Sequence, residues 1–490
     1  MSHPFLIQGG MGAGVSGWRL ARAVSKRGHL GVVAGTAVDT ILVRRLQRGD
    51  PGGHTRRALG KFPVPEIADQ ILERYFIPGG KPEGVPFRRI RMYSLAPPLE
   101  LFQLTVALNF VGIYLAKEGH DGVVGVNLLE KIQMPNLASL YGAMLADVDY
   151  VLMGAGIPRE IPGVLDHFAD HAEATLKITV AGETAEDDFR MRFDPVKVVG
   201  ALPGKLKRPF FLAIIASTVL AKAMKNRSTG TVNGFVIEGP TAGGHNAPPR
   251  GRLALDANGE PIYGKKDVVD LDKIGELGLP FWLAGSHGRK GCIAEARARG
   301  ATGIQVGTVF AFCEESGLDP AIKNDVLLSV LDGTAVVYTD PLASPTGFPF
   351  KVIQHPGSVA ETSVYEARTR VCDLGYLRTG YRLEDGRVGY RCPSEPIAAY
   401  LRKGGKFEDT QHRRCVCNGL LSNLGLPQLQ SNQAVEPMIL TCGDDLVRLG
   451  RFLHDGSTRY TAADVIEELC DESESGDLIQ KPELLQSRVC

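Results

Sequence analysis

The chain has 490 residues, too many for one ordinary core, so we expect one large domain with additions. Lysine plus arginine and aspartate plus glutamate both number 55, so the net charge is zero and no basic field favours nucleic acid or an anionic membrane. The N-terminus shows no signal-peptide pattern. We therefore expect a cytoplasmic protein whose nine cysteines are reduced.

Short apolar runs recur along the chain, and each ends in a glycine-rich or polar turn. Most are continuously apolar, which is typical of strands covered on both faces, as in parallel sheets. Helical patterns lie between them, and in the clearest, 16–28, Ser16 is the candidate N-cap and Gly28 ends the helix. The predicted strands are 5–8, 30–34, 122–127, 150–153, 210–216, 234–238, 280–284 and 303–307.

Eight strands that alternate with helices predict an α/β protein with a (β/α)8 TIM barrel. A doubly wound open sheet is the alternative. The most apolar stretch, 101–116, is too short to span a bilayer comfortably and carries Gln103 and Asn109. We expect it to be a buried helix.

Two connections are too long for simple crossovers between strands. Residues 44–95 are rich in proline, glycine and arginine and predict an insertion. Residues 158–205 contain two partly alternating runs, which predict a β-hairpin that serves as a lid or as an oligomer contact. The sequence therefore leaves open whether the protein forms a homo-oligomer.

The character of the chain changes near residue 345, where cysteines cluster and helical patterns such as 462–470 follow. We expect a barrel over 1–345 and a C-terminal, partly helical extension over 346–490. The junction 341–351 favours a plain linker, with a return over the barrel's pocket as the alternative.

In a TIM barrel the carboxyl ends of the strands form the active face. There the stretch 234-GFVIEGPTAGGHNAPPRG-251 delivers His245 into a glycine-rich loop, and such loops at strand ends commonly bind ligands. The loops after the seventh and eighth strands, 284–288 and 306–308, combine glycine with Ser286 and Thr308. Barrels often bind phosphate with these two loops through backbone N–H groups, although ordinary turns are the alternative.

Five motifs follow one another in chain order. They are the opening IQGGMG, the GVN of the third strand, the AGGH after the sixth, the AGSHG after the seventh and 301-ATGIQVGTVFAF-312. Together they resemble the nitronate monooxygenases, formerly called 2-nitropropane dioxygenases, whose wider group includes the flavin-dependent enoyl-ACP reductases. The resemblance covers about 4–40, 120–156 and 210–315.

The resemblance implies a flavoprotein that binds FMN without a covalent bond and oxidises a small alkyl nitronate with O2 to a carbonyl product and nitrite. It implies that His245 is the catalytic base or hydrogen-bond donor. The implied cofactor-binding residues are Gln8, Gly10, Met11, Asn127, Gly243, Gly244, Gly285, Ser286, Gly288, Gly307 and Thr308.

The histidine loop departs from the family pattern. Family members often have an acidic residue and alanine before the GGH and a glycine soon after it, whereas here the run is Gly-Pro-Thr-Ala-Gly-Gly-His-Asn-Ala-Pro-Pro-Arg. Arg250 is a candidate for a substrate carboxylate or phosphate, with an exposed arginine as the alternative. The substrate therefore stays open: an NAD(P)H-dependent flavin enoyl-thioester reductase and a non-catalytic barrel partner subunit are the rival hypotheses.

Four cysteines, Cys372, Cys392, Cys415 and Cys417, lie close together in the extension. Such a set could hold zinc or an iron–sulfur cluster, but the spacing is not a pair of C-x2-C knuckles. We therefore expect reduced thiols and no bound metal.

Overall fold

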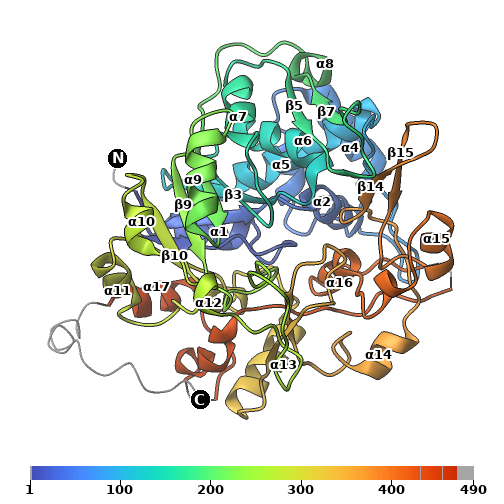
Figure 1. The fold of residues 1–490 in the computed structure, drawn as a ribbon. Coiled ribbons are helices and arrows are strands. Elements are labelled where there is room, and N and C mark those ends of the chain that lie inside the picture. Colours follow the sequence, from blue (N-terminus) through green and yellow to red (C-terminus); the bar gives the residue numbers. More distant parts are fainter. Residues whose placement is uncertain (1–2, 431, 455, 472–490) are drawn as a thin grey trace, which may run out of the picture.

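The computed structural model describes residues 3–430, 432–454 and 456–471. Its centre is a closed barrel of eight parallel strands, which confirms the predicted (β/α)8 fold (Figure 1). Each of the eight predicted strands is present, and only the ends shift. They are β1 (Leu6–Gln8), β2 (Leu30–Ala34), β3 (Val124–Leu129), β4 (Tyr150–Gly154), β8 (Phe210–Ile215), β9 (Gly234–Glu238), β10 (Phe281–Ala284) and β11 (Gly303–Val306).

The barrel strands are continuously apolar because both of their faces are buried. One face fills the barrel's interior with large side chains such as Tyr150 and Trp282, both at most 4% exposed. The other face packs against the surrounding helices in the main core. The pairing of β1 with both β11 and β2 closes the ring, so all eight carboxyl ends open on the same face.

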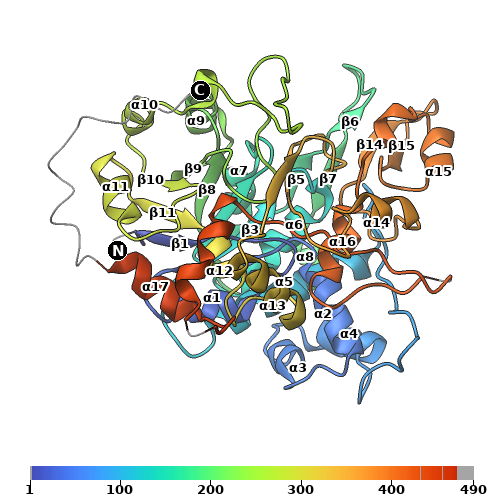
Figure 2. The same cartoon turned by 90° about the horizontal axis from the view of Figure 1, so that it is seen from below.

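Helices follow the strands and surround the barrel (Figures 1 and 2). The helix α5 is long and apolar enough to cross a membrane by length and composition, but 78% of its most apolar window is buried in the protein, as we expected for 101–116. The helices up to residue 331 are α1 (Trp18–Ser25), α2 (Val38–Gln47), α3 (His54–Leu59), α4 (Pro65–Tyr75), α5 (Leu99–Lys117), α6 (Gln133–Leu145), α7 (Ile161–Ala169), α8 (Pro195–Val199), α9 (Thr218–Arg227), α10 (Leu271–Gly275), α11 (Cys292–Ala298), α12 (Thr308–Ala311) and α13 (Pro320–Leu331).

The first helix begins later than its sequence pattern predicts. Gly17 is the N-cap of α1, and Ser16 makes no capping bond. The hydroxyl of Ser16 instead accepts the N–H of Met11 and donates to the carbonyl of Gly9 at 3.4 Å. Ser16 therefore fastens the glycine-rich loop after β1, which lies on the active face.

The two predicted insertions take different forms. Residues 44–95 contain the end of α2, then α3, α4 and irregular chain. Within 158–205, β5 (Ala174–Lys177) and β7 (Arg190–Phe193) form an antiparallel pair. A short strand between them, β6 (Val180–Ala181), pairs with β14 of the C-terminal region (Thr379–Arg382).

The C-terminal region lies over the barrel instead of standing apart from it (Figure 2). Residues 341–351 are not a plain linker, because they connect the paired strands β12 and β13 and return over the cavity. The remaining elements are β12 (Val337–Asp340), β13 (Phe350–Ile353), α14 (Thr362–Ala367), β15 (Val388–Arg391), α15 (Ile397–Arg402), α16 (Val416–Ser422), the 3₁₀ segment η3 (Asp444–Phe452) and α17 (Ala462–Cys470).

Candidate active site

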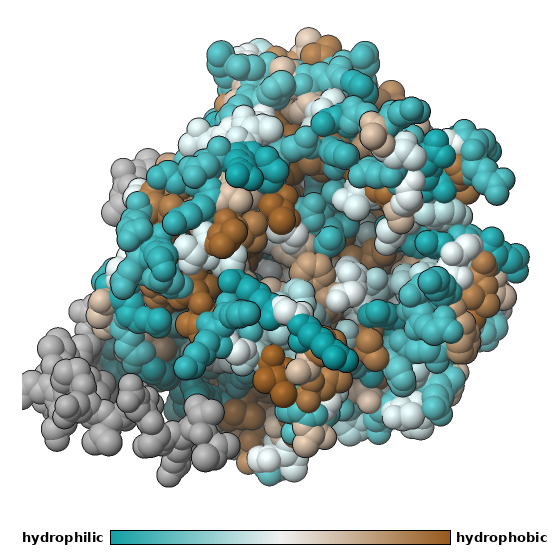
Figure 3. Space-filling model, viewed as in Figure 1, coloured by the Kyte–Doolittle hydropathy of each residue, from teal (hydrophilic) through white to brown (hydrophobic). Residues whose placement is uncertain are grey.

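A large cavity opens at the carboxyl ends of the barrel strands. It encloses about 1580 Å³, its open mouth included, whereas a second hollow measured in the same way encloses about 500 Å³. Residues after seven of the barrel strands line it, together with residues of the C-terminal region. In the view of Figure 3 the surface is largely hydrophilic, with apolar side chains gathered near its centre.

The described residues that line this cavity include acidic side chains but neither lysine nor arginine. The acidic side chains are Glu238 and Asp445. Most of the remaining lining side chains are small or apolar. Such a cavity favours an uncharged, partly apolar ligand and offers an anion only backbone N–H groups and hydroxyls.

His245 lies in the cavity wall and is fixed by the C-terminal region. Its Nε2 lies 2.7 Å from the hydroxyl of Ser344, and its ring meets that of Phe350 edge-on with centroids 4.8 Å apart. Burial lowers the pKa of His245 from 6.5 to about 4. The imidazole is therefore uncharged at neutral pH, which makes it a hydrogen-bonding group and a weak base.

Backbone contacts hold the loop on both sides of His245. The N–H of Lys351, on β13, donates to the carbonyl of Gly244 at 3.0 Å, and the N–H of Gly244 donates to the hydroxyl of Thr441 at 3.0 Å. A side chain at Gly243 would place its Cβ 2.6 Å from the backbone of Cys442. The loop is rich in glycine because two other segments of chain pass directly against it.

Glu238, at the carboxyl end of β9, is a partly buried acid in the cavity wall. Burial raises its pKa from 4.5 to about 8, so the carboxyl group keeps its proton at neutral pH. The sequence alone predicted no role for Glu238. An acidic residue that ends an apolar barrel strand on the active face was the signal available.

The loop after β1 lies across the barrel from the histidine. Gly10 and Met11 line the cavity together with Asn127 of β3, as predicted. A Cβ at Gly10 would lie 2.2 Å from the Cβ of Asn127, so only glycine allows these two strands' ends to meet. Gln8 does not line the cavity, because it is 0% exposed and its Oε1 accepts the N–H of Val32, on the neighbouring strand β2, at 3.0 Å.

The two predicted phosphate loops also meet at the cavity, where Gly285, Ser286, Gly307 and Thr308 line its wall. Gly285 has a φ of 95°, a conformation that glycine adopts without strain. Gly288 differs, because it does not line the cavity and its N–H donates to the carboxylate of Asp445 at 3.0 Å.

The segment around Asp445 therefore covers part of the predicted phosphate site. Next to it, the N–H of Gly443 donates to the hydroxyl of Thr308 at 2.8 Å, which leaves the hydroxyl proton of Thr308 free to donate elsewhere. Nothing in the local sequence pattern of 441–445 predicted this contact with the barrel loops.

Tyr376, from the C-terminal region, lines the cavity near β2 and α2. Its hydroxyl donates to the carboxylate of Asp39 at 2.6 Å and lies 2.7 Å from the hydroxyl of Thr40. The other oxygen of Asp39 accepts the hydroxyl of Thr105 at 3.0 Å. This buried network fixes the wall that Tyr376 forms and joins the extension to the barrel.

Arg250 lies outside the cavity and is exposed. Its Nη2 donates to the carbonyl of Ala216 at 3.0 Å, and its N–H donates to the carboxylate of Asp267 at 2.8 Å. Both bonds serve the loop itself. The structure thus favours the exposed arginine over the substrate contact.

The residues that line this cavity fit a flavin in two respects. Its walls combine glycine backbone from the two predicted phosphate loops with Asn127 and Met11. The side-chain Oε1 of Gln305, at the end of β11, is buried and accepts no hydrogen bond from the protein. A ligand N–H can satisfy that oxygen, which otherwise carries a desolvation cost of about 1–3 kcal/mol.

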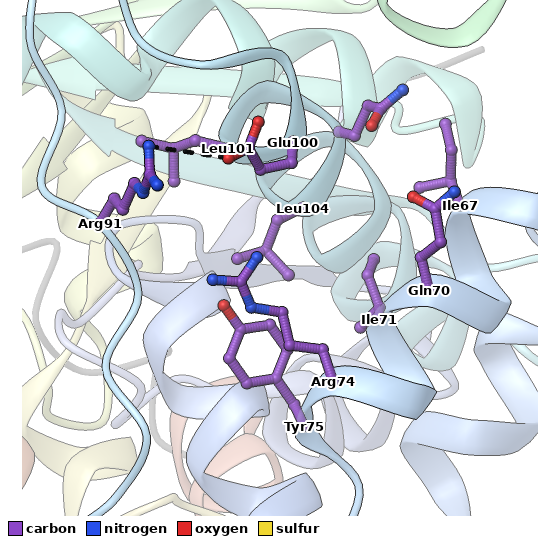
Figure 4. A pocket seen from close by; sticks show the side chains of 10 residues that line it. Ile67, Gln70, Ile71, Arg74, Tyr75, Arg91, Glu100, Leu101 and Leu104 are labelled. Atoms are coloured by element: carbon purple, nitrogen blue, oxygen red, sulfur yellow. Dashed lines mark ion pairs between the residues drawn. The ribbon is translucent and has the colours of Figure 1, made fainter.

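A second hollow lies between α4 and α5, away from the barrel mouth (Figure 4). Its wall includes the ion pair of Arg91 and Glu100, 3.8 Å apart, above apolar side chains of Ile67 and Leu104. None of the predicted site residues lines it, so it plays no part in the chemistry proposed below.

Residues 204–341 match the family model of nitronate monooxygenase. This chain therefore resembles that oxidoreductase family. The matched segment contains β8 to β11, the His245 loop and both predicted phosphate loops. The resemblance predicted from the motifs is confirmed over this part of the barrel.

A curated relative from Mycobacterium tuberculosis is similar to this chain over about half of the relative's length. It is named (3aS,4S,5R,7aS)-5-hydroxy-7a-methyl-1-oxo-octahydro-1H-indene-4-carboxyl-CoA dehydrogenase and is 26% identical over 236 residues. The match covers 47% of this chain and 54% of the relative. The chain thus spans about half the length of that relative.

Solved structures with a similar fold include nitroalkane oxidase from Streptomyces ansochromogenes, 16% identical with a TM-score of 0.42 and a coverage of 95% of this chain and 94% of that one. FabK from Thermotoga maritima is 18% identical, with a TM-score of 0.37 and coverages of 73% and 72%. The enoyl reductase domain of MlnA from Bacillus amyloliquefaciens is 12% identical, with a TM-score of 0.45 and coverages of 95% and 93%.

Proposed function

We propose that this protein is an FMN-dependent oxidoreductase that reduces the carbon–carbon double bond of an acyl thioester with NAD(P)H. The observation that carries the proposal is that a carboxyl group, Glu238, and an imidazole, His245, line the same cavity. Glu238 keeps a proton at neutral pH, while His245 stays uncharged. Reduction of a conjugated double bond adds a hydride and a proton, so it needs a proton donor in the cavity.

The walls support an uncharged acyl substrate. Among the described lining residues no lysine or arginine faces the cavity, so a small anion such as a nitronate finds no cationic partner. Apolar side chains, including Leu377 and Leu420, offer surface to an acyl chain. The relative named a carboxyl-CoA dehydrogenase also acts on a thioester, which agrees with this substrate class.

When bound, FMN supplies hydride transfer between the pyridine nucleotide and the substrate. Asn127, Met11, Gln305 and the loops at Gly285 and Gly307 would hold it, with the hydroxyls of Ser286 and Thr308 toward the phosphate. His245, held by Ser344, orients the thioester carbonyl by a hydrogen bond. Glu238 holds the proton that the substrate carbon receives.

Crotonyl-CoA and NADPH test this proposal, with the saturated thioester detected by mass spectrometry. We expect turnover by the wild type and a loss on the order of 10²-fold in kcat for Glu238→Gln, with KM little changed. The exposed Glu276→Gln is the matched control and should keep wild-type kcat. Equal kcat in Glu238→Gln and the wild type would remove Glu238 from the mechanism.

Nitronate monooxygenase is the second candidate, because the family model over residues 204–341 bears that description. In that reaction the substrate is already an anion, and His245 would contribute a hydrogen bond rather than remove a proton. Propyl-2-nitronate with O2, followed by nitrite release, tests this candidate. Nitrite production without any response to NADH or NADPH would place it ahead of the reductase.

A further inference from the structure

Four cysteines gather in one small pocket beside the barrel cavity. Cys372 follows α14, Cys392 directly follows β15, and Cys415 and Cys417 lie at the start of α16. All four line a pocket of about 290 Å³, and Cys417 also lines the main cavity. Three separate segments thus bring sulfur atoms together at the edge of the candidate active site.

The four cysteines do not share one role. Cys372 is partly exposed and Cys392 is buried, and both line this pocket. Cys415 instead lies 3.7 Å from the carbonyl of Val371, and its sulfur accepts the side-chain amide of Asn418 at 3.7 Å. Within the described part of the chain, no three His, Cys, Asp or Glu side chains are arranged to hold a metal ion.

Cys372 and Cys392 differ in the way that an attacking thiol differs from a resolving one. Cys372 is the more accessible of the two, and both sulfurs line the same small pocket. The neighbouring Cys392 side chain and the charge of Arg378 lower the pKa of Cys372 against the effect of burial. The neighbouring Cys372 and burial raise the pKa of Cys392 well above its usual value. A partly exposed thiol with a lowered pKa beside a second thiol is typical of redox-active cysteines.

We propose that Cys372 and Cys392 form a redox-active dithiol that a hydroperoxide oxidises to a disulfide. The Cys372 thiolate attacks the terminal oxygen of the hydroperoxide, its O–O bond breaks, and Cys372 becomes a sulfenic acid. Cys392 then attacks that sulfur and expels water. With hydrogen peroxide, two thiols and one peroxide give one disulfide and two waters, and the sulfurs supply both electrons.

The position of the pair ties this oxidation to the cavity wall. Tyr376 and Leu377 follow Cys372 closely in the chain and line the cavity. Cys417 lines the cavity together with these two residues. A disulfide bond between Cys372 and Cys392 therefore acts on the segment that forms this wall, whichever substrate the cavity binds.

Thiol counting and peptide mapping test the proposal. Purified protein is treated with one equivalent of hydrogen peroxide, denatured and alkylated. We expect the wild type to lose two alkylatable thiols and to yield a Cys372–Cys392 cross-linked peptide with no added oxygen. Cys392→Ser should instead gain oxygen at Cys372, and Cys372→Ser should keep its thiols. Cys313→Ser, a buried cysteine remote in sequence, is the control and should form the cross-link like the wild type.

The unmodified wild type gives a second measurement that does not depend on the folding of a variant. Its cysteines are alkylated with iodoacetamide between pH 6 and 9 and mapped. We expect Cys372 to react fastest, with a midpoint below the usual ~8.5 of a free cysteine. Alkylation of Cys372 no faster than that of Cys292, a cross-link between other cysteines, or stoichiometric zinc or iron that protects the four sulfurs would each overturn the proposal.

Discussion

Replacing Glu238 with glutamine should make the protein more stable at high pH but not at low pH. Glu238 has an ordinary pKa of 4.5 in the unfolded chain and a pKa of about 8 in the folded protein. Between these values the folded state binds one more proton than the unfolded state, so the free energy of unfolding falls as the pH rises. This contribution of Glu238 to the free energy of unfolding is fully present below pH 4.5 and is lost as the pH rises through about 8.

The gap between the two pKa values sets the magnitude. At about 1.36 kcal/mol per pH unit, it corresponds to at most about 5 kcal/mol. The carboxyl group faces an open cavity, and water there screens the charge. We therefore expect the wild type to lose about 2 kcal/mol between pH 5 and 9 relative to Glu238→Gln.

Urea unfolding of both proteins across this pH range measures the difference. The exposed Glu276→Gln serves as the matched control and should follow the wild type at every pH. A difference between Glu238→Gln and the wild type that is the same at pH 5 and pH 9 would refute the reasoning, because it would show that Glu238 has the same pKa in both states.

Three further substitutions test the site. His245→Ala should keep its flavin absorbance but lose most turnover, measured as kcat with crotonyl-CoA; full activity would remove His245 from the mechanism. Gly10→Ala should cost about 1–3 kcal/mol in urea unfolding and weaken FMN binding, because its Cβ meets Asn127 at 2.2 Å; unchanged FMN affinity and stability would contradict this contact. Tyr376→Phe should lower the free energy of unfolding by about 1–3 kcal/mol, because Asp39 loses a buried hydrogen bond. A decrease below about 0.5 kcal/mol, the lower end for a typical hydrogen bond, would contradict the network.

The barrel could be predicted from the sequence because its signals are local. Each parallel strand is buried on both faces, so 234–237 and 150–153 are continuously apolar. The loops at the strand ends followed from this, and Gly10, Asn127, His245 and Thr308 do line one cavity.

The parts that sequence reasoning missed depend on contacts between distant segments. Tyr376 and Leu420 reach the cavity from the C-terminal region, and the carboxylate of Asp445 accepts the N–H of Gly288. No periodicity or turn pattern near these residues indicates which part of the barrel they touch. Gln8 does not line the cavity for a different reason: its buried side chain accepts the N–H of Val32 on the neighbouring strand.

The most direct test of the proposed chemistry is an anaerobic absorbance titration of the purified protein. NADH, NADPH and propyl-2-nitronate are added separately, and crotonyl-CoA follows each. The account predicts an oxidised flavin spectrum that is bleached by NADH or NADPH and restored by crotonyl-CoA, with no response to the nitronate. A flavin that ignores both pyridine nucleotides and responds to the nitronate alone would contradict it and assign the protein to nitronate oxidation.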